Sequence, residues 1–159
     1  MVQRADEFSL VVVLEDGAAQ RTAFLQELAE ALGKSFPFLD CDEPTYDPLP
    51  KIRQLAPQLP KGIPLILTGM EAWMRRQDAE GEPFWANLNS AREELREILP
   101  RPLILLLPSF LFAVASRAAP DLFSGTSLVF AFQSEKQQPV HPLLWLHYPA
   151  MAGLALSEK

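Results

Sequence analysis

The chain has 159 residues, of which 48% are hydrophobic and 21% are charged, a composition that fits one globular domain and excludes a disordered chain. Its formal net charge of -6 leaves no basic surface to offset phosphates, so we expect neither nucleic acid nor a membrane surface as its partner. A single cysteine, Cys41, allows no internal disulfide and favours a cytoplasmic location.

The first predicted strand covers residues 8–14, a continuous valine-rich run typical of a strand that is buried on both faces. Asp16 is expected to cap the helix that follows. Gly33 is expected to end it. Between these two residues the apolar side chains recur at helical spacing, at Ala23, Phe24, Leu28, Ala31 and Leu32.

The middle of the chain predicts two further strands, at residues 36–41 and 63–69, both short and apolar. Between them, residues 49–59 offer one or two helical turns, limited by Pro57 and Pro60. The stretch that follows the third strand, 71–83, is mixed and polar, and it predicts a helix that passes into a loop.

Residues 84–99 predict the most regular helix, with one apolar face made of Leu88, Ala91, Leu95 and Ile98 or Leu99. A fourth strand follows at 102–108. Ser109 is then expected to cap a helix that runs to residue 119 and is ended by Pro120. The fifth predicted strand is 127–132.

Five apolar strands that alternate with helices predict a three-layer, doubly wound α/β fold. Its five-stranded sheet is expected to be mainly parallel, with a P-loop NTPase-like or Rossmann-like topology. The α/β domain is predicted to cover residues 1–134. Residues 135–159 then form a polar linker and an apolar segment, which we expect to pack on the domain or on a partner. The candidate interface residues of this segment are Leu143, Leu144, Trp145, Tyr148 and Met151.

Ligands of open parallel sheets bind where the strands end, so the residues just after each strand are the candidate site. They are Glu15, Asp16, Asp40, Asp42, Thr68, Glu71 and Ser109. The turn after the first strand has one glycine, two acids and no lysine, whereas a phosphate-binding loop needs several glycines and a lysine. Thr68 and Gly69 stand directly after the apolar run of the third strand, where a metal-binding acid is expected in an active NTPase. We therefore expect no catalytic residue, no cofactor and no NTP hydrolysis.

The acids among these residues, Glu15, Asp16, Asp40 and Asp42, have the oxygen ligands that Mg²⁺ prefers. The simpler interpretation is that Asp16 caps a helix and that the others are solvated loop acids, so no metal ligand is assigned. Cys41 has no histidine near it in the sequence, and it is expected to be a small buried residue.

Two stretches, "FWANLNSAREELREILPRPLILLLP" and "FAVASRAAPDLFSGTSLVFAF", resemble STAND-type NTPase-like domains of bacterial conflict and signalling proteins. The resemblance spans residues 8–132, and "PLILTGMEAW" matches the third-strand position. Active members use a P-loop and an acidic strand-three motif, and this chain departs from both. The resemblance therefore implies an inactive branch and carries over no catalytic residue. The signature positions that it does carry over are structural ones: Asn89, Arg92, Pro120 and Asp121.

The sequence thus predicts a non-catalytic, NTPase-like scaffold or interaction domain in a bacterial signalling or defence system. We expect it to contact a protein partner or further copies of itself. One alternative is a receiver-like signalling domain, which also has acids after the first strand and a hydroxyl after the fourth. Another is a small metal-dependent enzyme that uses the acidic strand ends.

Overall fold

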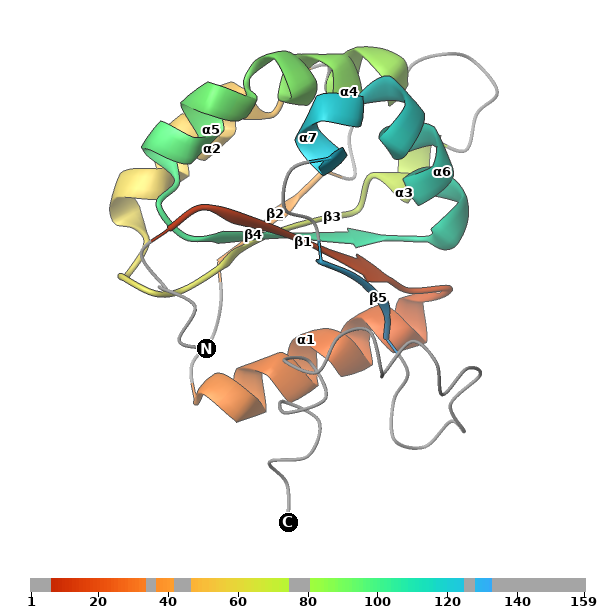
Figure 1. Cartoon of the computed structure of the whole chain (residues 1–159). Coiled ribbons are helices and arrows are strands. Elements are labelled where there is room, and N and C mark those ends of the chain that lie inside the picture. Colours follow the sequence, from red (N-terminus) through yellow and green to blue (C-terminus); the bar gives the residue numbers. More distant parts are fainter. Residues whose placement is uncertain (1–6, 34–36, 42–46, 75–80, 125–127, 133–159) are drawn as a thin grey trace.

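The computed structural model of the chain is a three-layer α/β fold, with a central sheet between helices (Figure 1). It describes residues 7–33, 37–41, 47–74, 81–124 and 128–132. The strands are β1 (Ser9–Leu14), β2 (Phe38–Asp40), β3 (Leu65–Thr68), β4 (Pro102–Leu107) and β5 (Leu128–Ala131). Each lies within the run that the sequence predicts, and the α/β fold class is confirmed.

The helices alternate with these strands along the chain. They are α1 (Ala18–Leu32), α2 (Leu49–Leu55), the short 3-10 helix η1 (Ala56–Gln58), α3 (Glu71–Met74), α4 (Gly81–Ser90), α5 (Arg92–Ile98), α6 (Ser109–Ala118) and α7 (Pro120–Ser124). Within the described ranges, no helix combines the length and the apolar character that crossing a bilayer requires.

All strand pairs of the sheet are parallel, in the order β2-β3-β4-β1-β5. β1 pairs with β4 over its whole length, from Ser9 opposite Pro102 to Leu14 opposite Leu107. The receiver-like alternative would place β1 between β2 and β3, in the order 2-1-3-4-5 of flavodoxin-like sheets. Here β1 lies between β4 and β5, so the sheet order does not favour that alternative.

The strands are apolar on both sides because helices cover both faces of the sheet. Leu10, Val12 and Leu105 point into a large core beneath α2 and α4 to α7. Val13 and Leu106, at alternating positions, point to the other face, where α1 packs. Figure 1 shows α1 on its own side of the sheet and the other helices on the opposite side.

This arrangement leaves a crevice at the carboxyl ends of β1 and β4. The chain leaves β1 for α1 on one face, and it leaves β4 for α6 on the other (Figure 1). Neighbouring strands whose helices depart to opposite faces form the topological switch point, where open α/β sheets bind ligands. The Glu15 N–H donates to the Leu107 carbonyl at 2.9 Å, so the β1–β4 ladder extends to the crevice.

The predicted helix over 84–99 is wrong in its continuity, since α4 ends at Ser90 and α5 begins at Arg92. Ala91 lies between them with φ -90° and ψ 7°. The residues before the break include two asparagines and a serine, whose side chains compete for backbone hydrogen bonds and favour helix ends. The Arg92 guanidinium donates to the Asn89 carbonyl at 3.1 Å and so satisfies a backbone group at the break.

The apolar face predicted for α1 is only partly buried. Gly33 ends the helix as expected, in the left-handed conformation at φ 63°. Of the helix residues, Phe24 alone is buried, and Leu32 is 42% exposed. The sequence pattern predicts α1 correctly as an amphipathic helix, but it does not reveal that no second described helix lies beside it.

Candidate functional site

An open pocket of about 370 Å³ lies at the crevice between β1 and β4. It is lined by the turn after β1, the first residues of α1 and α3 and the connection into α6. The lining residues are Glu15, Asp16, Gly17, Ala18, Arg21, Glu71, Pro108 and Phe110. Four of the predicted strand-end residues, Glu15, Asp16, Glu71 and Ser109, thus come together around this crevice, three of them in its lining.

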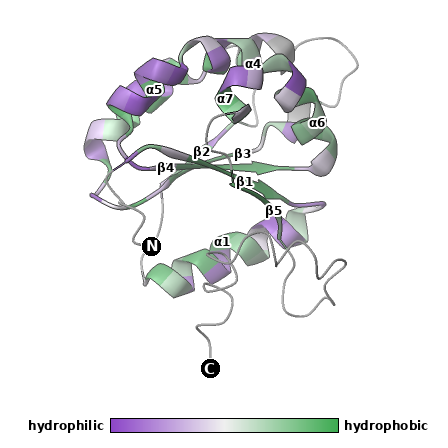
Figure 2. Cartoon of the chain, viewed as in Figure 1, coloured by the Kyte–Doolittle hydropathy of each residue, from purple (hydrophilic) through white to green (hydrophobic). Residues whose placement is uncertain are grey.

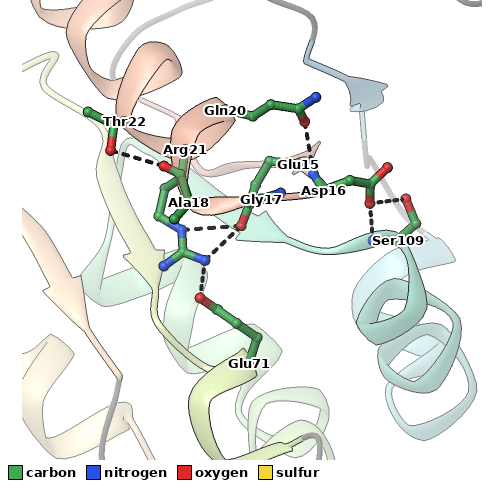
Figure 3. A network of polar contacts seen from close by, with 9 residues as sticks. All are labelled: Glu15, Asp16, Gly17, Ala18, Gln20, Arg21, Thr22, Glu71 and Ser109. Atoms are coloured by element: carbon green, nitrogen blue, oxygen red, sulfur yellow. Dashed lines mark hydrogen bonds and ion pairs between the residues drawn. The ribbon is translucent and has the colours of Figure 1, made fainter.

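Arg21 lies at the centre of this site, with its guanidinium between two carboxylates (Figure 3). Its Nε and Nη2 donate to Glu15 Oε1 at 3.2 and 3.0 Å, and Nη2 also donates to Glu71 Oε1. The Glu15 side chain is 1% exposed and that of Glu71 is 13% exposed. The ion pairs therefore join β1, α1 and the start of α3 across the end of β4. We call these three residues the Arg21 cluster.

Burial by itself lowers the pKa of Arg21, but the hydrogen bonds and charges of Glu15 and Glu71 outweigh it and raise that pKa above its ordinary value. The guanidinium is therefore charged at every pH at which the fold can be studied. Negative charge still exceeds positive charge in the pocket. Glu15, Asp16 and Glu71 contribute -3 and Arg21 contributes +1, a formal sum of -2.

The turn after β1 uses its backbone donors within the chain. The Gly17 N–H donates to Glu15 Oε2 at 3.0 Å, and the Asp16 N–H donates to Gln20 Oε1 at 2.9 Å. A phosphate-binding loop instead turns its N–H groups toward the ligand. Gly17 is also extended, with φ 170°, and a Cβ there would meet nothing within 4 Å, so this turn does not depend on glycine.

Both helix caps predicted near the crevice are wrong. Asp16 does not cap α1, since Gly17 occupies the N-cap position and no side chain caps this helix. Ser109 is the first residue of α6, after Pro108 at the N-cap. Instead, Asp16 Oδ1 accepts from the Ser109 hydroxyl at 3.1 Å and from its N–H at 3.4 Å (Figure 3). Asp16 thus caps the helix after β4 rather than its own.

The remaining strand-end residues do not join the site. Asp40 is exposed at the end of β2, three strands away from β1, which at about 4.8 Å per strand is roughly 14 Å. Thr68 is buried, its hydroxyl has no hydrogen-bond partner within the described ranges, and its carbonyl accepts from the Cys41 N–H. Asp42 lies outside the described residues. Among the residues that the structure describes, no three acids, histidines or cysteines are grouped to hold a metal.

Two positions that the sequence resemblance singled out, Asn89 and Asp121, take part in a separate contact between α4 and α7. Asn89 Oδ1 accepts from the Leu122 N–H at 2.9 Å, and Asn89 Nδ2 donates to Asp121 Oδ2 at 3.3 Å. Pro120 ends α6 as predicted, but it also begins α7, a helix that the sequence pattern does not predict. Asn89 thus caps α7 from a neighbouring helix, a structural role.

Arg21 is absent from the predicted strand-end residues because it lies one turn inside α1. The only signal in the sequence is its spacing of six residues from Glu15, at the end of an apolar strand. The interface residues predicted beyond the sheet, Leu143, Leu144, Trp145, Tyr148 and Met151, lie outside the described residues.

Comparison with known proteins adds no relative. No protein-family description matches the chain, and neither a curated protein nor a solved structure is significantly similar to it.

Proposed function

We propose that the chain is a non-catalytic, NTPase-like interaction domain of a bacterial signalling or defence system, which acts through contacts with a protein partner or with further copies of itself. The observation that supports this proposal is the Arg21 cluster in the crevice. A carboxylate of the chain itself accepts the Gly17 N–H, a donor that a phosphate-binding turn would present to its ligand.

Electrostatics in the crevice oppose a phosphate. Two like charges about 4 Å apart repel by about 4 kcal/mol at an effective dielectric constant of 20. Each uncompensated contact between a phosphate oxygen and a carboxylate such as Glu15 or Asp16 would thus weaken binding about a thousandfold. Arg21 can offset one such contact, but the formal sum of the lining charges is -2.

Apolar surface beside the crevice supports the choice of a protein as the partner. Phe110 is 45% exposed at the edge of the pocket, in the first turn of α6. Large exposed aromatic side chains are enriched in protein interfaces. The net charge of -6 argues against nucleic acid or an anionic membrane in that role.

The proposal is tested by thermal unfolding with millimolar ATP or GTP, each with Mg²⁺ and with EDTA. A nucleotide at 100 times its Kd would stabilise the fold by about 2.7 kcal/mol. That corresponds to a rise in Tm of roughly 5–11 °C for a chain of this size. We expect a change of less than about 1 °C under all four conditions. A Mg²⁺-dependent rise that is accompanied by phosphate release would overturn the proposal.

A further inference from the structure

The described residues cover the two faces of the sheet very unequally. Among them, 22 buried residues form the core beneath α2 and α4 to α7, whereas five form the core between the sheet and α1. Figure 1 shows α1 on one side of the sheet and the other labelled helices on the opposite side. A single helix about 10–12 Å wide cannot span five strands that are about 4.8 Å apart.

Apolar side chains are accordingly left half-covered on α1. Leu25, Leu28 and Leu32 follow one another at helical spacing and form a stripe along the helix. Leu25 and Leu28 are partly buried against the small core, and Leu32 is 42% exposed. Several turns of α1 are green in Figure 2, whereas α5 is mostly purple.

The neighbouring edge strand, β5, is likewise apolar and only partly covered. All four residues of β5 are only partly buried. Phe130 and Phe132 contact Phe24 of α1, with ring centroids 6.5 and 5.2 Å apart, and both are partly exposed. We call Leu25, Leu28, Leu32, Phe130 and Phe132 together the α1 face.

The chain continues from this face. The Phe132 N–H donates to the Leu14 carbonyl at 2.9 Å, so the last described residue still belongs to the sheet. Beyond it the sequence has 27 further residues (159 minus 132), and the stretch 142–156 contains no Asp, Glu, Lys or Arg. The nine residues 133–141 can reach about 30 Å, more than the roughly 22 Å length of α1.

We propose that residues 142–156 pack in cis on the α1 face and supply the cover that α1 alone does not provide. A short linker raises the effective concentration of such a segment to the millimolar range, which favours its own domain over a second copy at micromolar protein. The uncharged composition of the segment matches a surface of leucine and phenylalanine side chains. The packing involves no residue of the crevice. It is therefore tested independently of the proposed absence of nucleotide binding.

Photo-crosslinking in the full chain tests the proposal. Trp145 is replaced by benzoylphenylalanine, and equal amounts of ¹⁴N- and ¹⁵N-labelled protein are mixed before irradiation. We expect crosslinks from residue 145 to residues 24–32 or 128–132. In each of them, both crosslinked peptides should carry the same isotope label. The same probe at Ala113, which is exposed on the opposite side of the sheet, should give none to these residues. Crosslinks between differently labelled chains would show that a second copy covers the face, and crosslinks elsewhere or none would likewise overturn the proposal.

Hydrogen exchange provides a second measurement that does not depend on the probe. In the full chain, Leu143→Ser with Trp145→Ser should speed amide exchange in residues 24–32 at least tenfold, because the cover is lost. Exchange in residues 103–107 should stay unchanged. The matched variant Gln137→Ser with Gln138→Ser, in the polar linker, should leave both segments as they are. Unaltered exchange in residues 24–32 of the first variant would contradict the proposal.

Discussion

Removing the guanidinium of the Arg21 cluster is the sharpest test of what holds the crevice together. In Arg21→Ala, the nearly buried carboxylate of Glu15 and the largely buried one of Glu71 lose their counter-charge. Breaking a buried ion pair by removing one partner costs about 3–5 kcal/mol. Because the Arg21 side chain is 22% exposed and water can partly replace it, we expect the lower end, about 3 kcal/mol.

Urea unfolding followed by circular dichroism measures this loss. With a slope of about 2 kcal/mol per molar urea, the midpoint should fall by roughly 1.5 M. Arg53→Ala is the matched control, since it also removes an arginine that is paired with a glutamate. Arg53 and Glu94 are 51% and 38% exposed, so this loss should stay below about 1 kcal/mol.

Arg21 keeps its charge in the wild type at every accessible pH, since its pKa is raised. A loss no larger than that of Arg53→Ala at pH 7 would refute a stabilising role for the Arg21 cluster.

Two further predictions concern local backbone features. Asn89→Ala removes the acceptor of the Leu122 N–H and should lower the free energy of urea unfolding by about 1 kcal/mol. Ser90→Ala, at the exposed neighbouring position, should change that free energy by less than about 0.5 kcal/mol. Equal effects of the two substitutions would contradict the capping role of Asn89. Gly33→Ala should cost about 1 kcal/mol, because Gly33 has φ 63°. Gly17→Ala should cost clearly less, because Gly17 is extended and open around its Cα; a larger loss there than at Gly33 would show that the turn needs its glycine.

The strands could be predicted from the sequence because their signal is local. Continuous runs such as residues 10–14 and 102–107 are apolar at every position, which is typical of strands that are buried on both faces. The order of the strands is not local. That β1 lies between β4 and β5 depends on pairings between residues about 90 and 120 positions apart, and no run of residues encodes them by itself.

The candidate site was predictable in composition but not in its contacts. Glu15, Asp16, Glu71 and Ser109 follow strands that end at one edge of the sheet, and they do come together. Which partner each side chain selects depends on distances across the crevice. The Asp16 N–H donates to the side chain of Gln20, four residues later in the chain. The Asp16 carboxylate instead accepts from Ser109, 93 residues away.

Arg101 illustrates a residue whose role no pattern reveals. It is 6% exposed, and its guanidinium donates to the carbonyls of Pro60, Ile63 and Leu59 at 2.7, 3.2 and 3.4 Å. In the sequence it is an arginine between two prolines before an apolar strand, which predicts a solvated loop residue. The η1–β3 loop lies beside the start of β4, and its carbonyl groups accept the hydrogen bonds that compensate for the burial of Arg101.

The Arg21 cluster also gives a physical reason for a strand–turn–helix unit without phosphate-binding residues. β1 is an interior strand, paired with β4 and β5, so the turn after it must connect to α1 whatever it binds. In that turn the buried carboxylate of Glu15 accepts a hydrogen bond from the Gly17 N–H, and Arg21 neutralises this carboxylate. The same guanidinium reaches Glu71, so one side chain links the end of β1, the first turn of α1 and the start of α3. The crevice is thus stabilised by ionic contacts within the chain, although the buried Oε2 of Glu71 has no hydrogen-bond partner among the described residues.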